Sequence, residues 1–404
     1  MNIYSPEDVG MSSQRLALID PLMENYIHNN QLPGILTLLQ RQGKVVHLGK
    51  FGMMDIEAKK PMREDALFRI YSMTKPIVSI ALMMLFEEGL LSLKDPLTRY
   101  VPEFSKTKVH MGTGSLGPDL VEQNPAITIH HLLTHTAGLS YGWFFDTPVE
   151  DLYRQIIPNI FHREQTLDEV VREIAKLPLV FQPGTQWRYS FATDILGYVV
   201  QVIADMPLAE YLQERIFEPL EMVDTSFHVP ENKLERLAQI YVSEELYNPR
   251  ISKPSDVGLI GDVTIPTNGP SGGAGLISTL SDYLNFCNCL LDNGQYQGGR
   301  LIGRKTLEWM TSNHIPEKMM PLNIGPFPLD SGFGLGFRVT RSLGEARSLK
   351  SAGEYGWAGA AQTLFWIDPS EEFIGLFMTQ HMPVEPYPVT ERFQNLAYQA
   401  IEIR

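Results

Sequence analysis

The chain is poor in cysteine and in positive charge. Cys287 and Cys289 are the two cysteines among 404 residues, too few for a disulfide framework, and we interpret both as buried structural thiols on an expected helix. Lysine and arginine number 33 against 47 aspartate and glutamate, a formal net charge of −14. So acidic a chain argues against nucleic acid as a partner and offers no basic patch to an anionic membrane.

Long apolar runs and a leader pattern are lacking as well. Residues 1–8 contain neither a basic n-region nor an apolar h-region. The most apolar run, residues 76–86, is too short to span a bilayer and is followed by Glu87 and Glu88. The sequence as given therefore predicts a cytoplasmic protein without a membrane partner. Enzymes that act on cell wall or on antibiotics are normally exported, so this expectation disfavours such substrates.

The order of the structural signals predicts a discontinuous sheet domain. Hydrophobic content of 44% and charged content of 20% are typical of a globular enzyme with a large core. Strand patterns occur near both ends of the chain, at 35–39, 44–48, 334–339, 362–367 and 373–379, and helices with long loops lie between them. We expect an α/β (α+β) fold with one antiparallel sheet from 1–89 and 271–404, and a mostly helical domain at 90–270.

A serine and a lysine stand together where a long helical pattern begins. Ser72 would lie near the N-terminus of this helix, and Lys75 follows about one turn later on the same face. An amine beside a hydroxyl can take its proton if burial and neighbouring groups lower the lysine pKa. A serine N-cap followed by a surface lysine produces the same pattern. The pair by itself leaves both interpretations open.

Two other motifs compete for the chemistry. Residues 269–273 match G-x-S-x-G around Ser271, but proline and asparagine precede the serine where a nucleophile elbow needs a strand. We interpret this stretch as a flexible glycine-rich loop, and residues 111–118 as a glycine-rich surface loop. His131 and His135 have the spacing of a zinc-protease helix, yet no glutamate follows the first histidine and no third ligand is evident. We interpret both histidines as structural.

Aromatic residues offer a proton carrier and a pocket. Tyr189 follows a Pro-Gly turn and precedes a strongly apolar helix at 192–204, so it is well held. It is either a core tyrosine with a bonded hydroxyl or, beside the serine–lysine pair, a proton shuttle whose pKa a nearby cation lowers. Trp143, Phe144 and Phe145 lie in an expected loop at 139–145, where they could line an apolar pocket or belong to the core.

Several stretches together resemble a known family. The chain contains, in this order, Ser72-Met73-Thr74-Lys75, residues 132–139 (LLTHTAGL), Tyr189-Ser190, residues 272–276 (GGAGL) and residues 356–359 (GWAG). This set resembles the serine β-lactamase/penicillin-binding protein superfamily on its class C side, and in particular the family VIII carboxylesterases. The resemblance extends from about Glu7 to the final helix. It implies a β-lactamase-like fold with the active site between the sheet domain and the helical domain.

The resemblance also implies roles for individual residues. Ser72 would be the acylated nucleophile, Lys75 its proton partner and Tyr189 the general base. The backbone N–H groups of Ser72 and Ala360 would form the oxyanion hole. The aromatic residues Tyr141, Trp143, Phe144 and Trp357 suggest an apolar acyl or alcohol pocket, and Gly359 is also expected to bind substrate.

Two departures from the family pattern narrow the substrate. The third position of the family's Y-x-N motif is Phe191, and the asparagine replaced here contacts the amide side chain of β-lactam drugs. Trp357-Ala358-Gly359 stands where K-T-G is usual. The lysine of K-T-G holds a substrate carboxylate, which a tryptophan cannot do. Both departures favour neutral esters over antibiotics and cell-wall peptides.

The function implied is hydrolysis of short-to-medium acyl carboxylic esters through a covalent acyl-serine, without metal or organic cofactor. The partner would be a small-molecule ester. Three alternatives stay open: a β-lactamase or D-peptidase, with weak β-lactam hydrolysis surviving as a side activity; an acyltransferase that uses the same three residues; and a catalytically silent binding protein. The sequence does not fix the oligomeric state.

Overall fold

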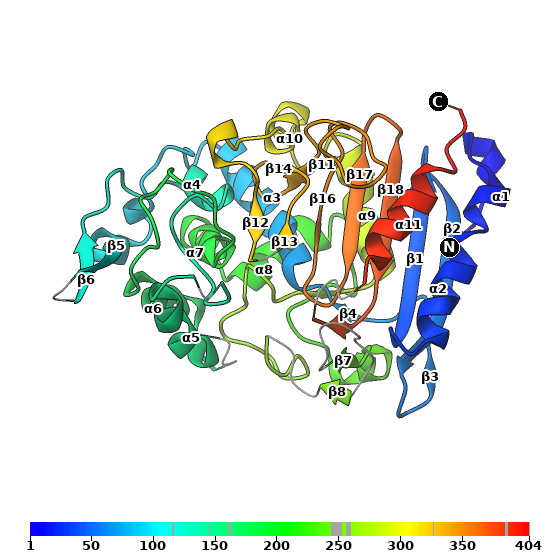
Figure 1. Ribbon diagram of the computed structural model, residues 1–404, viewed down its shortest axis with the longest axis horizontal. Helices are drawn as coiled ribbons and strands as arrows, with labels where there is room; N and C mark the ends of the chain where they lie inside the picture. Colours follow the sequence, from blue (N-terminus) through cyan, green and yellow to red (C-terminus); the bar gives the residue numbers. More distant parts are fainter. Residues whose placement is uncertain are drawn as a thin grey trace.

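An eight-stranded sheet runs through the molecule (Figure 1). The computed structural model describes residues 1–114, 117–144, 146–160, 164–243, 253–255, 260–325, 327–383 and 387–403. Neighbouring strands of the sheet are antiparallel, in the order β14-β15-β16-β17-β18-β1-β2-β3. Their bounds are Gly332–Phe333, Arg338–Val339, Tyr355–Ala358, Leu364–Asp368, Phe373–Met378, Gly34–Arg41, Lys44–Asp55 and Lys60–Pro61.

The two ends of the chain meet at the centre of this sheet, where β1 pairs with β18 and Leu38 lies opposite Leu376. Every residue of both strands is buried, because helices cover the two faces of the sheet. The expectation of one antiparallel sheet made from both ends is therefore confirmed. The division into a 1–89 plus 271–404 domain and a 90–270 domain stays a prediction.

Alternate residues of β1 face two different cores, as the two-residue period of a strand requires. Ile35 and Leu39 pack in a core with α11 (Val389–Tyr398) and α2 (Ile19–His28), which follows α1 (Ser13–Leu16). Leu36 and Leu38 belong to the larger core, with α3 (Thr74–Glu87) and α9 (Leu280–Leu291). Figure 1 shows α11 crossing one face of the sheet and α9 lying behind it.

Helices dominate the middle of the chain. They are α4 (Ile129–Leu133), α5 (Val149–Ile160), α6 (Leu167–Ala175), α7 (Ala192–Ala204) and α8 (Leu208–Leu212), with α10 (Arg304–Met310) further on. Helix α7 packs against α3 and has the bounds expected from the sequence. Within the described residues no single helix is long and apolar enough to cross a membrane. One pair, Ala192–Ala204 with Leu208–Phe217, passes that test by length and composition only and is bent by 84°.

Short elements complete the fold. The small strands are β4 (Phe68–Arg69), β5 (Val109–Gly114), β6 (Gly117–Val121), β7 (Ile240–Val242), β8 (Lys253–Ser255), β9 (Ile277–Ser278), β10 (Gln295–Tyr296), β11 (Gly299–Arg300), β12 (Asn323–Ile324), β13 (Phe327–Pro328) and β19 (His381–Met382). The 3₁₀ turns are Pro6–Val9, Tyr71–Met73 (η2), Leu97–Arg99, Pro102–Lys106, Glu231–Arg236 and Glu317–Met319, and a π turn spans Gln213–Phe217.

Some local expectations need correction. Of residues 111–118, expected as a surface loop, 111–114 and 117–118 pair in the β5–β6 hairpin, in which cross-strand pairing overrides the glycine content, and 115–116 lie outside the described residues. Helices α5 and α10 were not expected from the sequence. The expected strand at 334–339 is interrupted, because Gly336 adopts φ +93° where it passes Ser79, and only Arg338–Val339 pairs there. Cys287 and Cys289 are free and buried on α9, which confirms their structural interpretation.

Candidate active site

Ser72 lies on the short turn η2, between β4 and α3. The preceding residue, Tyr71, is fully buried and adopts φ +42°, a left-handed conformation that is strained for a bulky side chain. Leu276 holds the turn from outside: its carbonyl accepts from the Ile70 N–H at 3.1 Å, and its N–H donates to Thr74 Oγ1 at 3.1 Å. Strain maintained by surrounding contacts is typical of functional sites.

Lys75 points back at Ser72. Its Nζ donates to Ser72 Oγ at 3.3 Å and to the Gly273 carbonyl at 2.7 Å, and the side chain is 1% exposed. Burial lowers the pKa of Lys75 to about 7, and the negative charge of Asp194 opposes that shift. A large fraction of this amine is therefore neutral near pH 7. The alternative of a solvated surface lysine is excluded.

Tyr189 lies over Lys75, with Nζ 4.5 Å from its ring centroid. Its hydroxyl hydrogen-bonds with Ser72 and accepts from Trp357 Nε1–H at 3.2 Å. Burial raises the pKa of Tyr189, and those two hydrogen bonds only partly oppose it. This direction is opposite to the lowering that a nearby cation was expected to cause. Desolvation of the 3% exposed phenol is the largest cause of the shift, so Tyr189 stays protonated and can relay a proton rather than act as a permanent phenolate.

The end of β16 approaches the Ser72 turn at Gly359. A Cβ at this position would lie 2.4 Å from the Ile70 carbonyl oxygen and 2.2 Å from Thr363 Oγ1. Only glycine fits so close to another backbone, so the structure gives Gly359 a packing role, and a direct substrate contact stays a prediction. The approach brings Ala360 close to the Ser72 turn. The assignment of the Ser72 and Ala360 N–H groups to an oxyanion hole also stays a prediction.

The expected aromatic residues divide between two places. Tyr141 is buried at the cluster, with its centroid 5.4 Å from Tyr189, and it stacks on Trp143 at 4.3 Å. Trp143 itself is 41% exposed. Phe144 lies 4.4 Å under the Arg188 guanidinium, and it lines a cavity of about 670 Å³ together with Trp187, Met319, Met320 and Leu322. Phe145 lies outside the described residues.

Trp187, which lines the Phe144 cavity, also stacks on Tyr189, with ring centroids 6.4 Å apart at an interplanar angle of 22°. Ser72, Lys75 and Tyr189 themselves do not line this cavity. Phe191, which replaces the expected asparagine, is fully buried against Tyr141, at 4.4 Å between centroids. It therefore fills core space rather than offering a polar contact to a substrate.

Sequence reasoning missed Asp194 and Gly273. Asp194 lies in the first turn of α7, and its Oδ1 accepts from Ser271 Oγ at 2.5 Å and from the Gly273 N–H at 3.0 Å. The stretch interpreted as a flexible glycine-rich loop is thus tied to α7, and its Gly273 carbonyl holds Lys75. A lone acidic residue inside the apolar helix just after Tyr189 was the signal that could have identified Asp194.

The histidine pair is structural, as expected. His131 Nδ1 accepts from the Thr128 N–H at 3.2 Å in a capping box at the start of α4. His135 is buried and pairs its Nδ1 with Ser190 Oγ at 3.3 Å. Each ring therefore has a partner of its own that explains its position.

A second serine–histidine contact lies outside this cluster. His381 Nε2 is 2.8 Å from Ser243 Oγ. The Gln362 side-chain amide donates both to the Pro383 carbonyl at 3.3 Å and to His381 Nδ1 at 3.0 Å. Because Nδ1 accepts, Nε2 carries the ring proton and cannot take one from Ser243. This pair is not an activated nucleophile.

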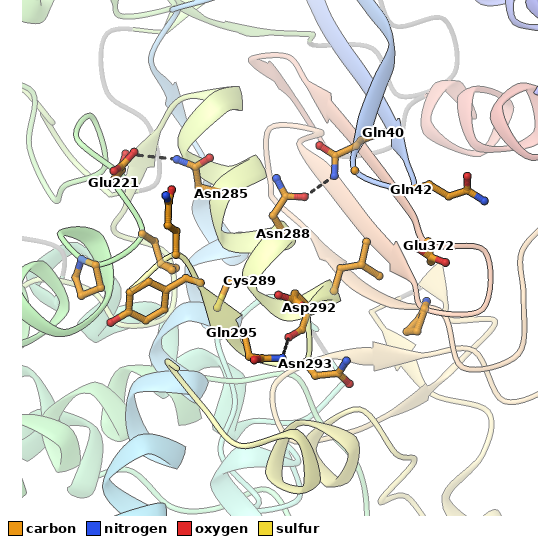
Figure 2. A pocket seen from close by; sticks show the side chains of 17 residues that line it. Gln40, Gln42, Glu221, Asn285, Asn288, Cys289, Asp292, Asn293, Gln295 and Glu372 are labelled. Atoms are coloured by element: carbon orange, nitrogen blue, oxygen red, sulfur yellow. Dashed lines mark hydrogen bonds between the residues drawn. The ribbon is translucent and has the colours of Figure 1, made fainter. Parts of the chain in front are cut away.

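A larger cavity of about 780 Å³ is also separate from the Ser72 cluster. Figure 2 shows it lined largely by amide side chains, among them Gln40, Asn285 and Asn288, near α9 and the β1–β2 turn. Gln40 donates a hydrogen bond to Asn288 in the wall of this cavity. Ser72, Lys75 and Tyr189 are not among its lining residues. Size alone therefore does not identify the reactive site.

Comparison with known proteins agrees with this geometry. The Beta-lactamase family model matches residues 17–399. Protein Rv1367c of Mycobacterium tuberculosis is 36% identical over 87% of this chain and 86% of its own length. Esterase EstB of Burkholderia gladioli is 35% identical over 69% of this chain and 70% of its own. The structure of EstCE1, a hydrolase with promiscuous acyltransferase activity, superposes with a TM-score of 0.77 at 25% identity, covering 95% of this chain and 99% of that one.

The matched family model covers most of the chain, and the fold, the antiparallel sheet and the esterase relatives agree with it. Within the serine hydrolase superfamily, the chain resembles the family VIII esterases. The chain therefore belongs to the beta-lactamase family.

Proposed function

We propose that the chain is a carboxylesterase that cleaves short-to-medium acyl esters through an acyl-enzyme on Ser72. The observation that carries the proposal is the contact of Lys75 Nζ with Ser72 Oγ at 3.3 Å, with the Tyr189 hydroxyl bonded to the same serine. Burial lowers the pKa of Lys75 to about 7, which makes it a proton acceptor near neutral pH. A weak hydroxyl nucleophile needs such a partner.

In the proposed reaction, Lys75 takes the Ser72 proton, directly or through the Tyr189 hydroxyl. Ser72 Oγ then attacks the ester carbonyl, while the N–H groups of Ser72 and Ala360 stabilise the oxyanion. The alcohol leaves with a proton delivered through Tyr189. Water repeats the sequence on the acyl-serine. Two preorganised N–H donors typically supply several kcal/mol of transition-state stabilisation.

Neutral esters suit the surroundings of Ser72 better than carboxylate-bearing substrates. Trp357, at the position where K-T-G has lysine, is 4% exposed and bonded to Tyr189, so it offers no cation to a substrate. Phe191 is buried. The Phe144 cavity, at about 670 Å³, has room for an acyl or alcohol group, and its lining combines methionine and aromatic side chains with the charged Asp146, Arg188 and Lys318.

Acyl transfer to an alcohol other than water is a second candidate function. The observation that favours it is the TM-score of 0.77 with EstCE1, a hydrolase with promiscuous acyltransferase activity. The same three residues would serve, because only the second acceptor changes. Weak hydrolysis of β-lactams is a third activity that the same acyl-serine chemistry allows, and turnover of a chromogenic cephalosporin measures it.

The test compares wild type, Ser72→Ala and Ser271→Ala on p-nitrophenyl esters of rising acyl length and on a chromogenic cephalosporin. We expect ester turnover that Ser72→Ala abolishes, and an acyl adduct on the Ser72 peptide by mass spectrometry. Cephalosporin turnover above ester turnover would favour a lactamase. Ester cleavage that survives Ser72→Ala but not Ser271→Ala would show that Ser271, and not Ser72, is the nucleophile.

An acceptor series separates hydrolysis from transfer. Rising concentrations of a primary alcohol should leave p-nitrophenol release intact while a transesterified product forms if the acyl-serine accepts alcohols. Free acid as the sole product at every alcohol concentration would confine the chain to hydrolysis. No turnover of either ester or cephalosporin would support the silent binding protein.

A further inference from the structure

Asp194 is a buried carboxylate with an unusual position. It is the only acidic residue of α7 and is 3% exposed. Its Oδ1 accepts from Ser271 Oγ and from the Gly273 N–H. Among the described residues, Oδ2 is buried without a hydrogen-bond partner. A buried carboxylate with an unmatched oxygen is unfavourable unless a positive charge lies near.

Gly273 connects this carboxylate to Lys75. Its N–H donates to Asp194 Oδ1 at 3.0 Å, and its carbonyl accepts from Lys75 Nζ at 2.7 Å. A Cβ on Gly273 would lie 2.4 Å from Asp194 Oδ2 and 3.0 Å from the Tyr141 hydroxyl. Oδ2 thus lies against Gly273, the residue whose carbonyl accepts from the Lys75 amine. The Ser271 turn is further held by its Oγ, which accepts from the Ala274 N–H at 3.0 Å.

We propose that Asp194 is a positioning residue for acyl transfer at Ser72, which both fixes the Ser271–Gly275 turn under Lys75 and supplies the countercharge for the ammonium formed there. The inference rests on the proposed function, since it concerns the same proton transfer. The Ser72 O–H bond breaks, an N–H bond forms on Lys75 Nζ, and the Ser72 oxygen bonds to the acyl carbon. The proton later passes to the departing alkoxide, and Asp194 remains a carboxylate throughout.

The other groups that face Lys75 carry no negative charge at neutral pH. Tyr141 and Tyr189 lie with their rings 5.3 Å and 4.5 Å from Nζ, and burial raises the pKa of both. His135 is buried, and both burial and the Lys75 charge lower its pKa. Asp194 is the group whose charge raises the Lys75 pKa against the effect of burial. Burial raises the pKa of Asp194 above its usual value, and the Lys75 charge opposes that shift.

Asp194→Asn tests the proposal, because it keeps an oxygen for Ser271 and Gly273 and replaces the charged carboxylate with a neutral amide of nearly the same shape. We expect the midpoint of the pH dependence of kcat/KM on p-nitrophenyl butyrate to fall by about one pH unit or more. The plateau should fall by at least ~10-fold, because the ammonium loses its countercharge. Ser271→Ala is the matched control, since it removes one hydrogen bond to Asp194 and keeps the carboxylate. Its midpoint should stay at the wild-type value.

Thermal unfolding of each variant shows whether a loss of activity comes from the lost charge or from a lost fold. A lower plateau in Asp194→Asn with an unmoved midpoint would make Asp194 a purely structural residue and overturn the proposal. A wild-type profile would overturn it as well. If Asp194→Asn does not fold, Gly273→Ala replaces it. The new Cβ would push Oδ2 away from the Lys75 amine, so the midpoint should move in the same direction. An unmoved midpoint in Gly273→Ala also overturns the proposal. Turnover that survives Ser72→Ala would reject the proposed function instead.

Discussion

The indole Nε1–H of Trp357 donates to the phenol oxygen of Tyr189 at 3.2 Å, with the two ring centroids 5.4 Å apart. In the β-lactam enzymes that this chain resembles, this strand position has a lysine that binds the substrate carboxylate. Here Trp357 occupies it and holds Tyr189, the candidate proton carrier. A neutral indole leaves the phenol oxygen bonded to Ser72 and adds no charge beside Lys75. The substitution changes both what the site can bind and how its tyrosine is oriented.

Trp357→Phe should lower kcat of ester cleavage about 10-fold with little change in KM. Phenylalanine keeps an aromatic ring but lacks the five-membered ring of indole, so the variant loses a hydrogen bond of about 1 kcal/mol to Tyr189 and some packing volume. Steady-state kinetics on p-nitrophenyl butyrate measure the effect. Trp309→Phe is the control, because Trp309 is 41% exposed on α10 away from Ser72. Equal kinetics for Trp357→Phe and wild type would show that the bond does not orient Tyr189.

Tyr189→Phe should slow acylation by about 10²–10⁴-fold, the usual contribution of a positioned proton carrier. The fold should remain, because the ring keeps its contacts with Tyr141, Trp187 and Trp357. The rate of the pre-steady-state p-nitrophenol burst measures acylation, and circular dichroism checks the fold. Tyr211→Phe, a buried tyrosine on α8, should leave the burst rate unchanged. Near-wild-type acylation in Tyr189→Phe would exclude it as the proton carrier.

Ester turnover should rise with pH with a midpoint near 7. Below the Lys75 pKa of about 7 the side chain is an ammonium and cannot accept the Ser72 proton, whereas above it the amine is free. A kcat/KM profile on a non-ionising ester measures the midpoint. Lys75→Arg should remove activity at every pH, since guanidinium stays charged. A midpoint above pH 9 would contradict the assignment of Lys75 as the proton acceptor.

Lys75→Met should abolish turnover, and its stability relative to wild type should be higher at pH 7 than at pH 9.5. The unfolded chain keeps a lysine pKa near 10.5, whereas the folded value is about 7. Between these values the unfolded state binds more protons, so this group opposes folding, and its penalty decreases as pH rises. Urea unfolding at pH 7 and at pH 9.5 should show a smaller gain at the higher pH. A destabilised Lys75→Met would mean that its contacts outweigh desolvation.

Gly359→Ala should lower both stability and activity. The added Cβ would overlap the Ile70 carbonyl and Thr363 Oγ1, and relief of such crowding typically costs about 1–3 kcal/mol. Any shift of β16 also moves Trp357 and Ala360 relative to Ser72. Gly344→Ala is the control, because no atom lies within 4 Å of a Cβ there. Thermal unfolding and ester kinetics should distinguish the two variants, and unchanged values for Gly359→Ala would reject the close packing.

Local pattern was sufficient for much of the fold. The hairpin around residue 42, helix α7 and the strands near both termini follow from periodicity and turn residues, which act over a few positions. The β5–β6 hairpin was missed because pairing between strands outweighs the loop preference of glycine there. Helix α10 was missed as well, and its few residues give only a short periodic signal.

The sequence by itself determined the elements and the order of the motifs, including the spacing that places Lys75 on the face of Ser72. Only the tertiary structure decided the electrostatics of the site. Asp194 meets Ser271 across 77 residues of chain, and packing from distant segments buries Lys75 and Tyr189. Desolvation and through-space charge depend on that packing, so the downward shift of the Lys75 pKa, the upward shift of the Tyr189 pKa and the link from Asp194 through Gly273 to the amine could not be read from spacing.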